Sequence, residues 1–280
     1  MRLSIVIPCL QRQEMLDRLL SQLTLQMMDR CDVEVIVVDD GSQPPLEIVN
    51  SSNIRLLRNN SPMGAPGARQ RGFAQSTGQY IHFHDSDDLL GHEWIANIIR
   101  ATAQEPAPDM IVTSRLIIAN NGVVSFWSAN QPQKVGSSVQ RLLSFQRFIN
   151  RIGPLGGVTF GRRAAQHIVF HKTPASQDWL MYDDVLYVAK NIYFDLQNYF
   201  LFNNHSTLRI SNNARSRAKG YVFAARHRFK NRRMQRLATR LYCAHGADDL
   251  APLVLVRHRW LKRTLCEILA RFPLLTGRRS

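Results

Sequence analysis

The sequence lacks the features that would place it in a membrane or an oxidising compartment. Its 280 residues include 4 cysteines, and no two of them have Cys-x-x-Cys spacing. Scattered cysteines of this kind favour a reducing cytosol over a disulfide framework or a zinc site. The densest apolar run, residues 250–256, contains Pro252 and is far shorter than the roughly 20 residues of a membrane-spanning helix.

The apolar start of the chain is also short. Residues 3–7 follow a single basic residue, Arg2, and form too small an apolar run for the core of a signal peptide. This run is more typical of a buried β-strand. We therefore expect the protein to remain in the compartment where it is made.

The chain has an ordinary globular composition but an uneven distribution of charge. Apolar residues make up 45% of it and charged residues 20%, as in packed domains. Residues 209–280 contain 18 Lys and Arg but only 3 Asp and Glu, whereas residues 1–208 contain 18 of each sign. The sequence thus predicts a neutral body and a strongly basic tail. Such a tail favours an anionic partner, either nucleic acid or an anionic membrane.

The first 115 residues alternate between short apolar runs and helical periodicity. The apolar runs predict strands at residues 3–7, 33–38, 54–57, 80–83 and 110–113. Segments with helical spacing lie between them, at residues 16–23, 65–76 and 93–103. Alternating strands and helices predict an α/β fold with a mainly parallel sheet and helices on both of its faces.

The pattern is looser beyond residue 115. Asn120-Asn121-Gly122 predicts a hairpin turn, and residues 138–150 and 180–190 have helical spacing. Between them lies a glycine-rich loop, residues 153–157. From residue 219 on, the sequence predicts two basic helices with a break near residues 246–252.

Acidic clusters follow two of the predicted strands. Asp39-Asp40-Gly41-Ser42 follows the second strand, and Asp85-Ser86-Asp87-Asp88 follows the fourth. Ligands of open α/β sheets bind at the carboxyl ends of the strands. A turn and a helix start are the alternatives, since both use these residue types. Closely spaced carboxylates repel one another unless a cation lies among them, so the second cluster is a candidate site for Mg²⁺ or Mn²⁺.

Residues 3–95 contain an ordered set of motifs. They are Ser4-Ile5-Val6-Ile7-Pro8, Val37-Val38-Asp39-Asp40-Gly41-Ser42, Asn60-Ser61-Pro62-Met63-Gly64, Ala68-Arg69-Gln70-Arg71-Gly72, Thr77-Gly78-Gln79-Tyr80-Ile81 and Asp85-Ser86-Asp87-Asp88. This ordered set resembles the family 2 glycosyltransferases, which have the GT-A fold. Gln177-Asp178-Trp179 is similar to a further family segment, and no family motif follows residue 212.

The resemblance implies a function and a donor site. Family members transfer a sugar from a nucleotide diphosphate sugar to an acceptor hydroxyl, with inversion. By the match, Pro8 and Asp40 contact the nucleoside, and Asp39 shapes the turn that binds the donor. Arg69 lies near the diphosphate or supports the base pocket. The family usually has Arg-Asn where this chain has Arg69-Gln70, so the match implies no role for Gln70.

The resemblance also implies a metal and a base. Asp85 and Asp87 match the Asp-x-Asp motif, which binds the donor through Mn²⁺ or Mg²⁺ and so offsets charge on the leaving diphosphate. Asp178 matches the general base, which takes the proton of the acceptor hydroxyl. A helix N-cap is the alternative for Asp178. Its rivals as the base, Asp183 and Asp184, do not fit the family spacing.

Other polar and aromatic residues have structural and functional interpretations. His82 and His84 share one face of a strand, and we expect them to be hydrogen-bonded there rather than in contact with the diphosphate. His205 lies where some relatives have a metal-binding histidine. The loop 153–157 either approaches the donor sugar or forms an ordinary turn. Trp179 is expected in the core rather than as a stacking surface for the acceptor.

These observations predict a catalytic domain at residues 1–212 and a basic helical extension at residues 213–280. Trp260, Leu261, Leu265 and Phe272 form an apolar stripe among arginines, as in helices that lie in a membrane interface. We therefore expect a location on the cytosolic face of a membrane and a glycan or lipid-linked acceptor, in surface polysaccharide or glycolipid synthesis. Alternatively, the helices pack on the body and leave their arginines in water.

Three other classes of protein share some of these features. A nucleic-acid-binding protein explains the basic tail, but the chain has no known nucleic-acid motif and its acidic clusters would be unexplained. A nucleotidyltransferase usually has a glycine- and lysine-rich loop near the first strand, and Cys9-Leu10-Gln11-Arg12 is not such a loop. A non-catalytic sugar-binding relative is the third alternative, against which the combination of Asp85, Asp87 and Asp178 argues.

Overall fold

The computed structural model describes residues 2–28, 30–49, 51–119, 121–129, 138–203 and 213–245, together with residue 268. His205, Asn120 and the apolar stripe of residues 260–272, apart from Ile268, lie outside the described residues. The chain forms two compact units. The first comprises Met1–Asn130, Pro154–Lys172 and Val188–His205, and the second comprises Gln131–Gly153, Thr173–Tyr187 and Ser206–Ser280. The predicted functional division at residue 212 stays a prediction.

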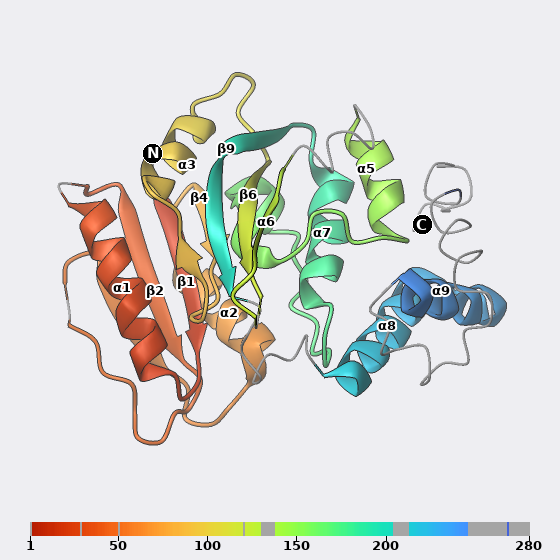
Figure 1. The fold of residues 1–280 in the computed structure, drawn as a ribbon, viewed down its shortest axis with the longest axis horizontal. Helices are drawn as coiled ribbons and strands as arrows, with labels where there is room; N and C mark the ends of the chain where they lie inside the picture. The colour runs from red at the N-terminus through yellow and green to blue at the C-terminus, as the bar shows by residue number, and fades with distance from the viewer. Residues whose placement is uncertain are drawn as a thin grey trace. The chain divides into compact units, whose positions relative to one another are not determined.

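The first unit contains a nine-stranded sheet among the described residues (Figure 1). The strand order is β3-β2-β1-β4-β8-β6-β9-β5, and β7 pairs with β6. The strands are β1 (Leu3–Cys9), β2 (Val33–Asp39), β3 (Ile54–Arg58), β4 (Tyr80–Phe83), β5 (Leu89–Leu90), β6 (Met110–Ile118), β7 (Val124–Trp127), β8 (Val158–Gly161) and β9 (Ile192–Asn203). The helices are α1 (Gln13–Met27), α2 (Gly64–Gln75), α3 (Trp94–Thr102) and α6 (Arg162–Ala165), with a 3₁₀ turn at Leu155–Gly157.

Half of the sheet is parallel and half is mixed. Strands β3, β2, β1 and β4 run parallel, as the alternation of strands and helices predicts. Strand β8 is inserted antiparallel between β4 and β6, and β9 pairs parallel with β6. The predicted α/β fold is confirmed, and the sheet has a larger antiparallel share than the sequence pattern indicates.

The core of the first unit is built from β1, β2 and the helices packed on them. Every residue of β2 is buried, and so is all of β1 except Pro8, which is half-buried. This explains why both strands are nearly continuous apolar runs, as expected for strands covered on both faces. The leucines of α1 point into this core at helical spacing, at Leu16, Leu19, Leu20 and Leu23.

A buried carboxylate, Glu34 in β2, joins three segments of the first unit. It accepts hydrogen bonds from Ser4 Oγ at 2.6 Å and from the backbone N–H and hydroxyl of Thr77 at 2.6 and 2.8 Å. Arg55 lies 3.2 Å from it. Burial alone raises the pKa of Glu34, but the hydrogen bonds from Ser4 and Thr77, together with the charge of Arg2, bring it below its ordinary value of 4.5.

We expect Glu34→Gln to lower the free energy of unfolding at pH 7 by about 2 kcal/mol, because hydrogen bonds to a charged group are lost. A carboxyl group whose pKa is lowered on folding stabilises the protein above its unfolded pKa and loses that effect as pH falls through its folded pKa. The difference in free energy of unfolding between wild type and variant should therefore become smaller below pH 4.5. Urea denaturation at pH 7 and at pH 3 measures this difference, and an equal difference at both pH values would contradict the prediction.

The second unit is helical in its described part. It contains α5 (Val139–Gln146), most of α7 (Gln177–Val188), α8 (Ala214–Arg228) and α9 (Arg232–His245). These helices share one apolar cluster, which includes Phe145, Trp179, Ala225, Leu241 and Tyr242. The helices α8 and α9 of the predicted extension therefore pack with α5 and α7 in a common core.

The first basic segment, which the sequence pattern predicts as one helix from residue 219, forms two helices, α8 and α9, separated at residues 229–231. The predicted break at residues 246–252 and the second predicted helix lie outside the described residues, apart from Ile268. The side chain of Asn231 accepts hydrogen bonds from the backbone N–H groups of Arg233 and Met234, at 2.8 and 3.3 Å, and so caps the start of α9. Asn213 caps α8 in the same way, through the N–H of Ser216.

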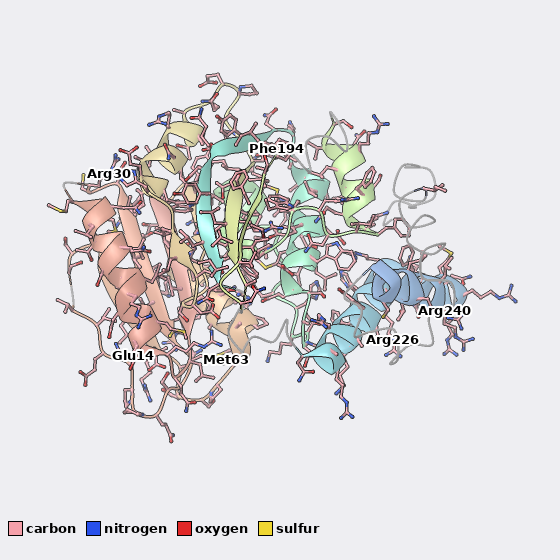
Figure 2. All side chains as sticks on the ribbon, viewed as in Figure 1. Glu14, Arg30, Met63, Phe194, Arg226 and Arg240 are labelled. Atoms are coloured by element: carbon pink, nitrogen blue, oxygen red, sulfur yellow. The ribbon has the colours of Figure 1, made fainter. Side chains whose placement is uncertain are left out.

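Basic side chains line the outer faces of α8 and α9. Figure 2 labels two of them, Arg226 and Arg240, which point away from their helices. The apolar faces of both helices lie in the core of the second unit, and most of their basic side chains lie in water, whereas the side chain of Arg228 is buried. Within the described part of the chain, no helix has the length and apolar character needed to cross a membrane. The exposed basic residues, which we call the basic stripes, are Arg215, Lys219, Arg226, Lys230, Arg232, Arg233, Arg236 and Arg240.

Candidate active site

The predicted donor-site residues of the first unit lie at one edge of its sheet. Strands β1, β2 and β4 are adjacent and parallel, so their carboxyl ends meet there (Figure 1). Pro8 lies opposite Val38 in the register of β1 and β2, and the backbone N–H of Asp40 donates to the carbonyl of Cys9 at 2.9 Å. The fold thus brings Pro8 and Asp40, the two predicted nucleoside contacts, to the ends of neighbouring strands.

The carboxylate of Asp39 is fully buried and holds the loop after β2. It accepts hydrogen bonds from the backbone N–H groups of Ser42 and Leu46, at 2.8 and 3.2 Å, and forms an ion pair with Arg58. Burial alone raises the pKa of Asp39, but these hydrogen bonds and the charge of Arg58 hold it below its ordinary value. This geometry fits the predicted turn-shaping role, whereas contact between Asp39 and a donor stays a prediction.

Asp40 fixes the entrance to α2. Its carboxylate accepts from the side-chain amide of Asn59 at 2.7 Å and from the backbone N–H groups of Met63 and Gly64 at 2.9 and 2.8 Å. Gly64 has a φ of +76°, a conformation that favours glycine. Asp40 therefore joins the end of β2 to the start of α2, and its contact with a nucleoside stays a prediction.

The loop after β4 gathers three carboxylates. Oxygen atoms of Asp85, Asp87 and Asp88 lie within 4.8 Å of one another. Asp87 and Asp88 are buried, and the side chain of Asp85 is 33% exposed. Clustered carboxylate oxygens are the donors that Mg²⁺ and Mn²⁺ prefer, so these residues fit a divalent metal. The sequence analysis did not assign Asp88, whose carboxylate accepts from the backbone N–H of Asn203 at the end of β9, at 3.0 Å.

Each predicted metal ligand has an arginine beside it. Arg12 lies 2.8 Å from the carboxylate of Asp87, and Arg69 lies 2.5 Å from that of Asp85. Arginine binds carboxylates and phosphates with the same planar set of N–H donors. The site therefore combines oxygen ligands for a cation with donors suited to a diphosphate. Sequence reasoning missed Arg12, although its position just after β1 places it at the same edge of the sheet.

These residues lie within a region shared with a known family. Residues 4–169 match the sequence model described as Glycosyl transferase family 2. The chain belongs to the family 2 glycosyltransferases. The predicted family is therefore confirmed. The match covers the strands that carry the Asp clusters and ends before Asp178 and the basic helices α8 and α9.

Three known proteins show what this family 2 chain is similar to. A poly(ribitol-phosphate) beta-glucosyltransferase from Bacillus spizizenii is 36% identical over 100 residues, which are 33% of this chain and 16% of that protein. The crystal structure of Staphylococcus aureus TarS 1–349 in complex with UDP-GlcNAc matches 97% of this chain and 82% of that one, with a TM-score of 0.66 and 15% identity. The mannosyltransferase PcManGT from Pyrobaculum calidifontis, in complex with GDP-Man and Mn²⁺, matches 98% and 86%, with a TM-score of 0.53 and 12% identity.

The structural matches confirm the predicted GT-A fold. At 15% and 12% identity they are evidence about fold alone. The chain spans only about one sixth of the length of the Bacillus relative, 16%. The ligands and reactions in their names are therefore properties of those proteins.

The two strand histidines of this family 2 chain are buried and hydrogen-bonded, as expected. His82 Nδ1 lies 3.0 Å from the carbonyl of Val158, and its Nε2 lies 3.1 Å from His84 Nδ1. A carbonyl only accepts, so His82 donates through Nδ1 and His84 donates to His82 Nε2. Burial and the neighbouring His84 lower the pKa of His82 well below its usual value. His82, in its neutral form, thus joins β4 to β8.

The glycine-rich loop has a packing role within the first unit. A Cβ on Gly156 would lie 3.0 Å from the ring of Phe200, and one on Gly157 would lie 2.9 Å from it. Both glycines therefore let the backbone approach Phe200 of β9. Contact between this loop and a donor sugar stays a prediction.

Asp178 of this family 2 chain belongs to the second unit, at the first turn of α7. Its carboxylate accepts from the backbone N–H of Trp179 at 2.7 Å, at a helix end that favours negative charge. Trp179 is buried, as predicted, and its ring N–H donates to the carbonyl of Gln146. Asp178 thus supports the helix start, and its role as a base stays a prediction.

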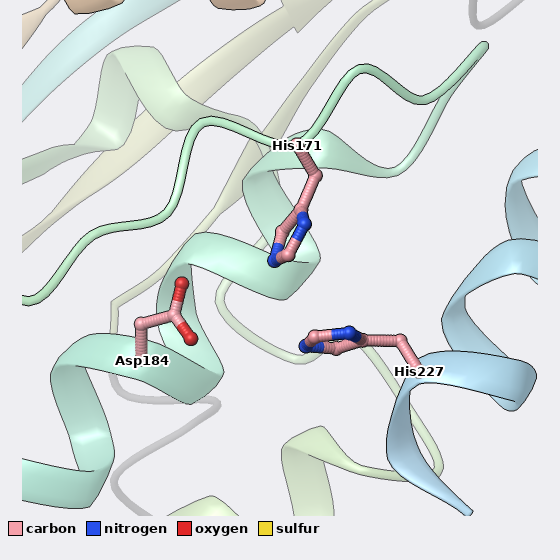
Figure 3. Close-up of side chains that lie close together, drawn as sticks. All are labelled: His171, Asp184 and His227. Atoms are coloured by element: carbon pink, nitrogen blue, oxygen red, sulfur yellow. The ribbon is translucent and has the colours of Figure 1, made fainter.

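The two rivals of Asp178 have partners on α8. Asp183 lies 2.6 Å from Arg228. Figure 3 shows Asp184 on α7 and His227 on α8, with ligand atoms within 4.8 Å of each other; His171 in the same view belongs to the first unit. Asp183 is therefore engaged in an ion pair within the second unit, and the choice of Asp178 as the base stays a prediction.

Proposed function

We propose that the chain transfers a sugar from a nucleotide diphosphate sugar to an acceptor hydroxyl, with inversion at the anomeric carbon. The observation that carries this proposal is the trio of carboxylates paired with Arg12 and Arg69, at the carboxyl ends of parallel strands in a family 2 chain. Cation ligands and phosphate donors side by side suit a nucleotide diphosphate as leaving group.

In this proposal the first unit binds the donor. Pro8 and Asp40 contact the nucleoside, and Asp39 keeps the loop after β2 in shape. Asp85 and Asp87 hold Mn²⁺ or Mg²⁺, which offsets negative charge on the leaving diphosphate when bound. Arg69 exchanges part of its contact with Asp85 for the diphosphate, as its planar donors allow.

The second unit supplies the base in this proposal. Asp178 accepts the proton of the acceptor hydroxyl while that oxygen bonds to the anomeric carbon. The bond from this carbon to the diphosphate oxygen breaks at the same time, and its electron pair leaves with the nucleotide diphosphate. A single displacement of this kind inverts the configuration.

Two of the similar proteins support parts of this proposal. PcManGT was crystallised with GDP-Man and Mn²⁺, which favours a divalent metal at the carboxylate trio. The Bacillus relative is named for poly(ribitol-phosphate), a phosphate-bearing polymer. We propose a glycan or lipid-linked acceptor in surface polysaccharide or glycolipid synthesis, to which the basic stripes are electrostatically suited.

A thermal screen of nucleotide sugars tests the class and identifies the donor. UDP-GlcNAc, UDP-glucose and GDP-mannose serve as first probes, each with Mn²⁺ and with EDTA. A donor at about 100 times its Kd stabilises the native state by about 2.7 kcal/mol, which raises the Tm by several degrees. We expect one donor to do so, and to be hydrolysed slowly, only with the metal. If a full panel of nucleotide sugars neither binds nor is hydrolysed, the proposal is wrong.

We also propose that the protein lies on the cytosolic face of a membrane, held by its basic tail. Each basic residue near an anionic surface contributes on the order of 1 kcal/mol. The apolar stripe of Trp260, Leu261, Leu265 and Phe272 supplies side chains that are stabilised by burial in a bilayer interface but not by contact with nucleic acid.

Liposome flotation tests this location. We expect the full chain to float with anionic vesicles but not with neutral ones, and a variant without residues 251–280 to be released. Hydrolysis of the donor should be largely unchanged by the deletion. A chain that ignores anionic vesicles but binds nucleic acid tightly at physiological salt would support the alternative, although the family accounts for acidic clusters that nucleic-acid binding leaves unexplained.

A further inference from the structure

Arg228, the last residue of α8, is a buried charge that joins four helical segments of the second unit. Its side chain is 2% exposed. Its Nε donates to Asp183 on α7 at 2.6 Å, and its terminal nitrogens donate at 3.3 Å to the carbonyls of Arg147 and Trp179 and to the hydroxyl of Tyr242 on α9. One guanidinium therefore connects α7, α8, α9 and the end of α5.

The guanidinium of Arg228 also packs on aromatic rings. Its central carbon lies 4.2 Å from the ring centre of Trp179 and 5.6 Å from that of Tyr242. The two rings meet edge to face, with their centres 4.7 Å apart. Cation–π contacts are strongest when desolvated, as here. Burial alone lowers the pKa of Arg228, but Asp183 and Tyr242 raise it overall, so the group stays charged.

An ion pair joins the end of α8 to α7. Asp183 on α7 faces Arg228 on α8, and Asp184 on α7 faces His227 on α8, the second of which Figure 3 shows. The side chain of Asp183 is 11% exposed, and a buried charge that loses its partner is strongly destabilising. The C-terminal end of α8 therefore cannot be treated as part of a separable tail.

We propose that Arg228 is a positioning residue for Asp178. Trp179 is held on three sides, since Arg228 binds its carbonyl and packs on its ring while Gln146 accepts its ring N–H. The backbone N–H of Trp179 in turn donates to the carboxylate of Asp178 at 2.7 Å. Arg228 thus fixes Trp179, and Trp179 fixes the carboxylate. The inference rests on the proposed role of Asp178 as the base.

This arrangement gives α8 a part in the reaction that the family match does not suggest. Arg228 lies beyond residues 4–169, in a segment for which the sequence analysis predicts surface contact. A base must be held in a narrow geometry, and a displacement of about 1 Å costs roughly 10²-fold in rate. Loss of the Arg228 contacts should therefore slow turnover without weakening the donor site of the first unit.

The experiment compares Arg228→Gln and Arg228→Lys with Arg100→Gln, a matched change of an exposed arginine on α3, outside the basic stripes and the donor site. For each we measure kcat and KM with the nucleotide sugar found in the screen, the Kd of UDP and GDP with Mn²⁺, and the Tm. We expect kcat to fall at least ~10-fold in Arg228→Gln and less in Arg228→Lys, with KM and Kd within about twofold of wild type. Arg100→Gln should match wild type.

Arg228→Gln leaves Asp183 without its buried partner and could unfold the protein. A double variant therefore serves as a control for stability. Asp183→Asn/Arg228→Gln removes both charges, so no buried charge is left without a partner, and we expect it to fold and to remain slow. A folded variant of either kind with wild-type kcat would show that Arg228 acts on stability alone. A matching loss of UDP and GDP affinity would also overturn the inference.

Asp178→Asn, measured in parallel, separates this inference from the proposed function. If Asp178→Asn keeps wild-type turnover, the base is assigned wrongly, whatever Arg228 does. If Asp178→Asn is slow while folded Arg228 variants are fast, the base stands and only the positioning inference is wrong.

Discussion

Asp87→Asn is expected to abolish sugar transfer, by a factor of at least ~10³, and to remove metal-dependent binding of UDP or GDP. The side chain of Asp87 is 3% exposed and lies within 4.8 Å of two other carboxylates. An amide in its place offers the metal a neutral oxygen, so the offset of charge on the leaving diphosphate is lost. The transfer rate and calorimetric binding of UDP and GDP with Mn²⁺ measure both effects.

Asp17→Asn is the matched control for Asp87→Asn. Asp17 is exposed on α1, where its carboxylate accepts from Gln13 at 2.7 Å. We expect this variant to behave as wild type. Both variants should keep the wild-type Tm to within a few degrees, because Arg12 remains partly in water. Full activity of Asp87→Asn, or of the wild type in EDTA, would contradict the proposal that a divalent metal binds at this site.

Asp178→Asn is expected to lower kcat by a factor of at least ~10² while the Kd of the donor stays the same. The variant keeps an oxygen that accepts from the N–H of Trp179, so the start of α7 should remain intact. The loss is then a loss of proton transfer. Single-turnover kinetics with saturating donor and acceptor measure it directly.

Asp184→Asn, on the same helix, is the matched control for Asp178→Asn. It removes a neighbouring carboxylate that faces His227, and we expect turnover within a few-fold of wild type. If instead Asp178→Asn lost donor binding and melted early, Asp178 would be a structural cap. A large loss in Asp184→Asn alone would move the base to that residue.

The parallel half of the fold and the acidic clusters were predictable because their signals are local. The runs at β1, β2 and β4 are mainly apolar, and each Asp cluster lies at or just after the end of a strand. Residues at the carboxyl ends of neighbouring parallel strands must meet at one edge. Asp40 and Asp87 could therefore be assigned to that edge from the sequence.

The remaining parts of the site depend on long-range pairing. The ion pair between Arg12 and Asp87 joins residues 75 positions apart, and that between Arg228 and Asp183 joins residues 45 apart. Strand β8 pairs antiparallel with β4 across an even longer separation. No periodicity reports such contacts, which is why the mixed half of the sheet and both arginines were missed.

The basic stripes destabilise their own helices through repulsion between like charges, whichever anionic partner they bind. No acidic residue lies between positions 213 and 245, and Arg232, Arg236 and Arg240 follow one another at helical spacing. Like charges at this spacing weaken a helix by about 0.2–0.5 kcal/mol per pair, and salt screens them over about 10 Å at 0.1 M. Added salt should therefore stabilise the second unit while it weakens the hold of that unit on any polyanion. Trp179 and Arg228 belong to the same unit. An anionic acceptor or membrane that covers the basic stripes would therefore also relieve this repulsion, and so stabilise the helices that position Asp178.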